Sequence, residues 1–262
     1  MEDEHAIYKI PEKKFFSAEI YDGHGGRRAA QVAAETLTAN FLHAWVRDIE
    51  NPSNARPCDS NNLRDAYIGV DKAIIGNGGD SGTTAVTFYV VDGKFIAANV
   101  GDSRAIIGTR RGCCYTLTTD HKPSLEEEKL RIEALGGTVT FYGTPRLQGI
   151  LAVSRALGDP ALKPYVSSEP RVVEGYLGRE NDYVILACDG VWDVLSPDEV
   201  IKIARAAKEP QAGAEKIMQM ALDRGSKDNI SVIVVDLRNY VMDIKQTRMK
   251  IATVIDYAAP LS

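Results

Sequence analysis

Apolar residues recur along the chain with two periods, and each period predicts one kind of element. In residues 27–46, alanines and large apolar residues return at steps of three and four, which predicts a helix with one buried face. The same period predicts a second helix over 62–76. Further helices are predicted from Ser124 to Gly136-Gly137, from Pro197 (capped by Ser196) to about 207, and over about 211–224.

Runs of β-branched and aromatic residues between turn residues predict strands. Two short strands are predicted within 6–22, around the turn Pro11–Lys14. Further strands are predicted over Thr83–Val91, Lys94–Val100, 105–108, 113–117, 183–188 and 230–237. Short turns between consecutive strands imply antiparallel pairing. The chain is therefore expected to have an α+β fold of two packed antiparallel sheets flanked by helices.

The sequence contains no internal repeat and no convincing linker, which favours one domain over residues 1–238. Residues 239–262 form a tail or an extension of the same domain. Five apolar residues of this tail have spacings that suit one face of a helix, and we expect the tail to pack on the domain or to extend loosely. They are Met242, Met249, Ile251, Val254 and Ile255.

Composition and charge narrow the classes of partner and location. A formal net charge of -5 gives no indication of nucleic acid or an acidic membrane surface as a partner. No apolar run approaches the ~18 residues that span a bilayer, and the acidic N-terminus does not resemble a signal peptide. The cysteine spacing matches neither a zinc site nor a disulfide framework, so we expect reduced thiols in the cytoplasm or nucleus, and a monomer. The cysteines are Cys58, Cys113, Cys114 and Cys188.

Three aspartates stand at predicted strand ends, each beside a glycine or an asparagine. Asp22-Gly23 and Asp189-Gly190 follow apolar strands, and Asp228-Asn229 leads directly into one. A single aspartate at a strand end is usually a turn or cap residue. Three such aspartates on a rigid sheet form a carboxylate cluster, which suits Mg²⁺ or Mn²⁺ better than zinc.

Clustered carboxylates repel one another, so this arrangement requires cations to be stable. Two divalent ions ~3.5–4 Å apart would bridge a water molecule and lower its pKa, so that hydroxide forms near neutral pH. Such a hydroxide suits a single-step, in-line attack on a phosphate. His24, two residues after Asp22, is a candidate proton donor to the leaving oxygen, because its glycine neighbours give the ring little core to pack into.

Seven blocks of the sequence, in order, resemble the metal-dependent type 2C serine/threonine protein phosphatases. Together they cover roughly residues 1–237, and seven ordered blocks are far more specific than any single motif. The blocks are Tyr21–Gly26, Ser81–Ala85, Val100–Arg104, Asp120–Pro123, Leu151–Asp159, Ala187–Asp193 and Ser226–Ser231.

The resemblance implies an α-β-β-α sandwich with a two-metal site at one end of the sheets, acting on phosphorylated protein substrates. Asp22 matches the aspartate that bridges both ions, and Gly23 the residue whose carbonyl binds one of them. Asp189 and Asp228 match the carboxylates of the other ion. Three further matches are implied: Glu2 as an acidic residue that reaches the site partly through water, Asp102 with Asp189 as a weaker third site, and His24 as the general acid.

Two more segments take roles from the resemblance. Residues 138–150 fall where the family carries a variable flap beside the active site, and are expected to influence which substrates are accepted. Arg155 is expected to brace that region. The family's phosphate-binding arginine lies a few residues before the Met-Glu-Asp segment, upstream of Met1 in this sequence. Without it we expect phosphate binding to weaken by a few kcal/mol. Arg27 or Arg28 would be partial substitutes, but we favour the interpretation that both lie on the solvated face of the first helix.

Two alternatives follow from these residues. The first is that the chain, without the upstream arginine, is a pseudophosphatase, in which the same fold binds a partner without turnover. The presence of all three principal aspartates argues against this alternative. Alternatively, Cys58 and Arg64 satisfy Cys-x5-Arg, the spacing of a cysteine-based phosphatase. The intervening residues lack phosphate-cradling glycines, and Asp59 would raise the pKa of the thiol, so we interpret that spacing as a coincidence.

Overall fold

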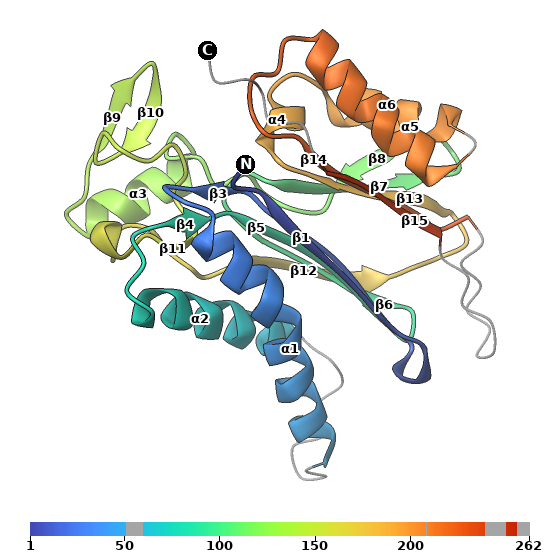
Figure 1. The fold of residues 1–262 in the computed structure, drawn as a ribbon, viewed down its shortest axis with the longest axis horizontal. Coiled ribbons are helices and arrows are strands. Elements are labelled where there is room, and N and C mark those ends of the chain that lie inside the picture. The colour runs from blue at the N-terminus through green and yellow to red at the C-terminus, as the bar shows by residue number, and fades with distance from the viewer. Residues whose placement is uncertain (51–59, 208, 239–249, 256–262) are drawn as a thin grey trace.

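Two five-stranded antiparallel sheets pack face to face at the centre of the molecule (Figure 1). The computed structural model describes residues 1–50, 60–207, 209–238 and 250–255. The first sheet has the order β1 (Glu4–Ile10), β2 (Phe15–Tyr21), β5 (Ala85–Val91), β6 (Lys94–Val100) and β12 (Arg171–Tyr176). The second has the order β15 (Lys250–Ile255), β14 (Ser231–Asp236), β13 (Asn181–Ala187), β7 (Arg104–Thr109) and β8 (Cys114–Thr116).

Helices cover the outer face of each sheet, which confirms the α-β-β-α sandwich (Figure 1). On the first sheet lie α1 (Arg28–Glu50) and α2 (Ser60–Gly76). On the second lie α5 (Pro197–Ala206) and α6 (Pro210–Asp223). No helix in the described part of the chain is both long and apolar enough to cross a bilayer.

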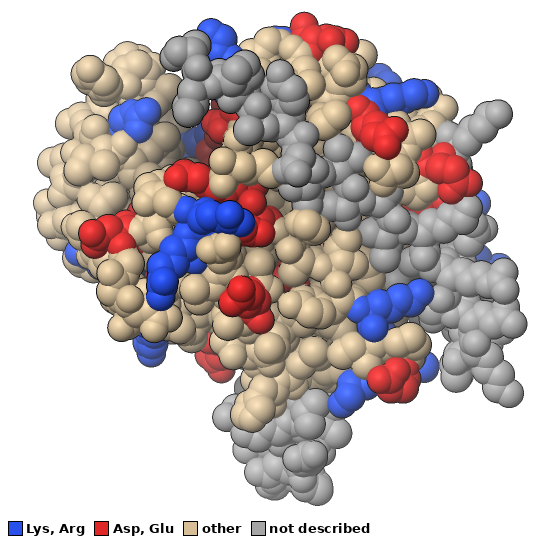
Figure 2. Space-filling view, viewed as in Figure 1, with Lys and Arg blue, Asp and Glu red and all other residues tan. Residues whose placement is uncertain are grey.

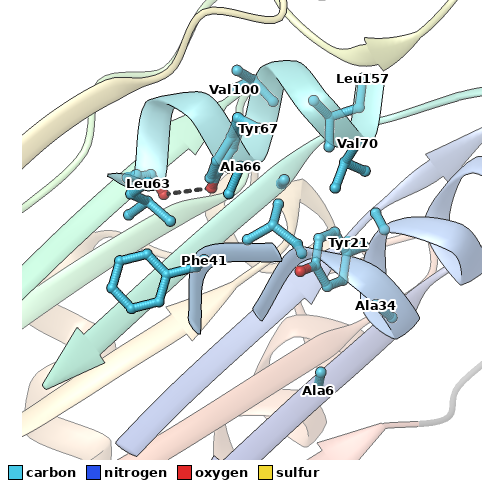
Figure 3. Close-up of a cluster of buried hydrophobic side chains, with 14 of the residues drawn as sticks. Ala6, Tyr21, Ala34, Phe41, Leu63, Ala66, Tyr67, Val70, Val100 and Leu157 are labelled. Atoms are coloured by element: carbon cyan, nitrogen blue, oxygen red, sulfur yellow. Dashed lines mark hydrogen bonds between the residues drawn. The ribbon is translucent and has the colours of Figure 1, made fainter. Parts of the chain in front are cut away.

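Three apolar layers fill the spaces of the sandwich. Phe41 of α1, Tyr67 of α2 and Tyr21 of β2 belong to the layer between the first sheet and its helices (Figure 3). Along β13, Leu186 packs between the two sheets, whereas its neighbour Ile185 packs towards α5 and α6. Successive strand residues point to opposite faces, so a strand buried on both sides is apolar throughout. This explains the continuous apolar run of β13.

A small lobe stands at one end of the sandwich (Figure 1). It contains α3 (Glu126–Ala134) and the hairpin of β9 (Val139–Tyr142) and β10 (Thr144–Leu147). A separate apolar cluster holds the lobe together, with Ile132 and Leu147 fully buried.

The remaining short elements are β3 (Gly23–His24), β4 (Gly82–Thr83), β11 (Leu157–Gly158), α4 (Asp189–Trp192) and 3₁₀ helices at Pro11–Lys13 and Pro160–Leu162.

The two serine caps turn out differently. Ser196 caps α5 as predicted: its side chain accepts a hydrogen bond from the Glu199 backbone N–H, and its own backbone N–H donates to the Glu199 carboxylate. The prediction for Ser124 was wrong, because α3 begins at Glu126 and Leu125 occupies the cap position. The backbone N–H of Leu125 donates to the Lys122 carbonyl, and this turn places Ser124 one residue too early to cap the helix.

The helical interpretation of the tail was wrong where the structure describes it. Residues Lys250–Ile255 form β15, which pairs with β14 along its whole length. Without β15, one edge of β14 would carry unpaired backbone N–H and C=O groups. The segment Lys250–Ile255 is rich in β-branched residues, which favour strands, and it pairs with this edge. Met242 and Met249 lie outside the described residues. The domain boundary near residue 238 stays a prediction.

Candidate active site

The strand ends that carry the predicted site residues meet at one edge of the sandwich. Glu4 of β1 pairs with Tyr21 of β2, and Ala187 of β13 pairs with both Arg104 of β7 and Val232 of β14. Antiparallel pairing brings the end of one strand beside the start of the next. The segments just beyond these ends therefore come together, although they are more than 200 residues apart in sequence.

A cleft of about 330 Å³ lies at this edge, and all seven predicted site residues line it. Acidic side chains gather around the hollow between the small lobe and the body of the molecule (Figure 2). The lining residues are Glu2, Asp22, Gly23, His24, Thr84, Asp102, Arg146, Leu151, Ala152, Val153, Asp189 and Asp228. The structure thus brings the predicted residues together, while their roles as ligands or acids stay predictions.

Asp22 is held by the segment that leads into β5. Its backbone N–H donates to Thr84 Oγ1 at 3.3 Å, and its carbonyl accepts from the Thr84 backbone N–H at 2.9 Å. Burial, followed by the charges of Asp3 and Asp189, raises the pKa of Asp22 well above its usual value. The fold therefore fixes this carboxyl in a position where its negative charge is unfavourable.

Two glycines let separate chain segments approach closely enough to build the cleft. A Cβ on Gly23 would lie 2.5 Å from the Glu2 carbonyl oxygen, and one on Gly190 would lie 2.1 Å from the Asn229 carbonyl oxygen. Any other residue at either position would push the segments apart. The Glu2 backbone N–H donates to Asn229 Oδ1 at 3.1 Å. This hydrogen bond links the segment that Gly23 contacts to the segment that Gly190 contacts. Gly23 thus has a packing role in addition to its predicted role.

Two carboxyl oxygens beside the cleft are buried without a hydrogen-bond partner among the described residues: Asp3 Oδ1 and Asp189 Oδ1. The other oxygen of Asp3 accepts from Ser231 Oγ at 2.6 Å. Burial, and then the charges of Asp102 and Asp228, raises the pKa of Asp189 to about 7. Leaving buried polar oxygens unsatisfied costs free energy, so these atoms are suited to a ligand.

The donor set fits a hard divalent cation. Carboxylate and carbonyl oxygens line the cleft, and a cation would relieve both the repulsion and the unsatisfied oxygen of Asp189. In the described residues, no group of three or more His, Cys, Asp or Glu side chains is placed to hold a metal ion, so cation binding in this cleft stays a prediction. Mg²⁺ usually keeps several waters and binds to only one or two carboxylates.

Asp102 differs from the other carboxylates because it has a cationic partner. Lys122 Nζ forms a close ion pair with Asp102 Oδ2. Burial raises the pKa of Asp102, while the Lys122 ammonium opposes that rise. Any cation that binds at Asp102 would therefore compete with Lys122, and the weaker third site stays a prediction.

His24 is paired with a carboxylate that the sequence did not single out. His24 Nε2 lies 2.9 Å from both oxygens of Asp159, whose side chain is buried. A carboxylate in this position fixes the orientation of the imidazole ring. Asp159 lies within the block Leu151–Asp159, 135 residues from His24, and only its presence in that block could have indicated a role.

The hydrogen bonds, ion pairs and exposure of the arginines bear on the roles that were predicted for them. Arg155 braces the lobe as expected: its guanidinium donates to Glu128 and to the Glu169 carbonyl. Arg27 forms an exposed ion pair with Glu4, and Arg28 is exposed on α1. Among the described residues, Arg146, which the sequence did not single out, is the arginine that lines the cleft.

The alternative of a cysteine-based phosphatase is not tested by the structure, because Cys58 lies outside the described residues.

Comparison with known proteins decides the family. The model of the protein phosphatase 2C family matches residues 1–230. The chain belongs to the protein phosphatase 2C family. It is 39% identical over 220 residues to Probable protein phosphatase 2C 59 of Arabidopsis thaliana, covering 82% of this chain and 68% of that protein. It is 37% identical over 239 residues to Probable protein phosphatase 2C 52 of Oryza sativa subsp. japonica, covering 90% and 47%.

Solved structures of the family have the same fold. Serine-threonine phosphatase 2C from Toxoplasma gondii superposes with a TM-score of 0.77 at 25% identity, covering 89% of each chain. A C. elegans sex determining protein superposes with a TM-score of 0.79 at 27% identity, covering 89% of this chain and 60% of that one. The chain spans 47% and 68% of the lengths of the two curated relatives. Family membership confirms the assignment to the protein serine/threonine phosphatases, for which dependence on Mg²⁺ or Mn²⁺ is typical.

Proposed function

We propose that this chain hydrolyses phosphoserine and phosphothreonine in proteins at the cleft lined by Asp22, Asp189 and Asp228. Two divalent ions, when bound, would supply an activated water and neutralise charge on the phosphate. Asp22, Asp189 and Asp228 would hold them through carboxylates, and Gly23 through its carbonyl. Glu2 would contribute at the edge of the site.

The observation that carries this proposal is the excess of carboxyl groups over cationic groups in the cleft. Asp22 and Asp189 are each held where burial and neighbouring carboxylates raise their pKa values. A fold gains no stability from such an arrangement on its own, because like charges repel. Bound cations would relieve the repulsion between these carboxylates, and this relief would favour cation binding. The cations would also attract the phosphate dianion to the cleft.

His24 would act as the proton donor to the leaving serine or threonine oxygen. Asp159 engages Nε2, so the other ring nitrogen, Nδ1, is the atom left to serve the substrate. His24 lines the cleft together with Asp22, so a proton donor and the carboxylates share one space.

The test is hydrolysis of a phosphothreonine peptide, with Mg²⁺ or Mn²⁺ titrated and EDTA then added. Asp228→Ala should abolish turnover and weaken metal binding. Asp92→Asn is the matched control, because Asp92 lies in the β5–β6 turn at the opposite end of the sheet and pairs only with Lys14 among the described residues. Turnover that survives EDTA, or that Asp228→Ala leaves unchanged, would refute the proposal. No observation favours the alternative of an inactive binding module.

A further inference from the structure

Arg146 is the basic residue of the cleft. Among the described residues that line it, Arg146 is the sole lysine or arginine, and it shares the cleft with five carboxyl side chains. It lies on β10, opposite Thr140 of β9, so the hairpin of the small lobe delivers this guanidinium to the active site.

The hydrogen bonds of Arg146 leave part of the guanidinium unused. Nη1 donates to the Ile150 carbonyl at 2.6 Å, which anchors the group to the segment that follows β10. Nε is buried and has no partner in the described part of the chain. An arginine carries five N–H donors in a fixed planar fork, and a buried donor without an acceptor costs free energy.

Several other partly buried arginines of this fold are paired with carboxylates, whereas Arg64 of α2, like Arg146, has a buried Nε without a partner among the described residues. Arg104 binds Asp120, Arg155 binds Glu128 and Arg205 binds Asp182. Arg146 forms no ion pair with any described residue, although five carboxyl groups line the same cleft. Its hydrogen bond to the Ile150 carbonyl leaves other donors of the guanidinium available to an anion.

We propose that Arg146 binds the phosphoryl oxygens of the substrate, an inference that rests on the function proposed above. The planar guanidinium fork matches two oxygens of a phosphate, and the charge makes these hydrogen bonds strong. Arg27 and Arg28, the substitutes considered from the sequence, are engaged by Glu4 or exposed on α1. Phosphate recognition thus comes from the same lobe that borders the cleft.

The test compares Arg146→Gln, Arg146→Lys and the control Arg111→Gln, which changes an exposed arginine in the turn between β7 and β8. Calorimetry of the Mg²⁺-loaded protein gives its affinity for inorganic phosphate. The same samples give Mg²⁺ affinity, melting temperature, and KM and kcat for a phosphothreonine peptide and for p-nitrophenyl phosphate.

We expect Arg146→Gln to weaken phosphate binding by about tenfold to a hundredfold, the value of a charge-assisted hydrogen bond. Its KM should rise by the same factor for both substrates, because they share only the phosphoryl group. Mg²⁺ affinity and the control should not change. Arg146→Lys should restore part of the phosphate affinity, since it keeps the charge but loses the fork.

Two results would overturn the inference. One is unchanged phosphate affinity in Arg146→Gln, even if its melting temperature falls, because Arg146 would then only anchor the lobe. The other is a KM that rises for the peptide alone, because Arg146 would then contact the peptide chain. Phosphate binding does not require turnover. A wild-type protein that binds phosphate through Arg146 without hydrolysing peptides would refute the proposed function and leave this inference standing.

Discussion

Two acidic side chains, only three residues apart, lie in opposite electrostatic environments. Glu19 belongs to β2 and is fully buried between the first sheet and its helices. Asp22 follows the end of the same strand and lines the cleft. Burial raises the pKa of both carboxyls. They differ in the groups that surround them.

Hydroxyl groups surround Glu19. Tyr21 Oη donates to Glu19 Oε2 at 2.5 Å, and Thr38 Oγ1 donates to Glu19 Oε1. Thr38 in turn contacts the hydroxyl of Tyr89 at 2.8 Å. These bonds oppose the effect of burial on the pKa of Glu19. The fold thus satisfies this carboxyl internally, and Glu19 ties α1 to the sheet.

Carboxylates surround Asp22. Asp3, Asp189, Asp102 and Asp228 add to the effect of burial and raise the pKa of Asp22 further. A buried acid that the protein satisfies is structural, whereas one that the protein destabilises requires a partner from solution. This difference, more than burial itself, distinguishes the candidate active site from the core.

The largest effect is expected from the histidine beside these carboxylates. His24→Gln should lower kcat for a phosphothreonine peptide by about a hundredfold or more, because general acid catalysis contributes at this level. The loss should be much smaller for p-nitrophenyl phosphate, whose leaving group departs without a proton. Asp159→Asn should show the same pattern at about tenfold, since it only orients the ring. Equal losses on both substrates would exclude the acid role.

The second effect is on stability. Glu19→Ala should lower the free energy of unfolding by about 3–4 kcal/mol, because it leaves a cavity and two hydroxyls without their acceptor. Denaturant unfolding measures this loss. At temperatures where the variant is folded, its Mg²⁺ affinity should equal that of the wild type. A change in Mg²⁺ affinity would mean that the two acidic regions are coupled rather than independent.

The third effect is a dependence of stability on pH. The folded pKa of Asp189 is about 7, above its unfolded value near 3.8. Between these values the folded state binds more protons than the unfolded state, so in EDTA the stability should fall as pH rises from about 4 to 7. The loss should be about 3–4 kcal/mol, because each unit of pKa difference corresponds to about 1.4 kcal/mol. Excess Mg²⁺ should abolish this fall, and unfolding curves at several pH values would test it.

Much of this arrangement was predictable because the informative residues are local to single strands. Asp22, Asp189 and Asp228 each adjoin an apolar strand and a glycine or asparagine, so the strand predictions already placed each of them at a strand end, and the family resemblance implied that these ends meet. Ser196 was predictable for the same reason, since its capping partner lies three residues away.

Other features depend on contacts between distant segments. Arg146 reaches the cleft only because the β9–β10 hairpin folds over it, and Asp159 meets His24 across 135 residues. The spacing of Ile251, Val254 and Ile255 suited a helix, but the free edge of β14 made it a strand. In each case a contact between segments distant in sequence determines the structure. A local sequence pattern contains no information about such contacts.

The most direct test of the comparison is the melting temperature of wild type and Asp22→Asn at pH 7, each in EDTA and in excess Mg²⁺. Asp22 destabilises the metal-free fold at this pH whether it is ionised or protonated, because the unfolded carboxyl is ionised without penalty. We therefore predict that Asp22→Asn melts above the wild type in EDTA, and that Mg²⁺ stabilises the wild type far more than the variant. A variant that melts below the wild type in EDTA, with a wild type indifferent to Mg²⁺, would contradict the account.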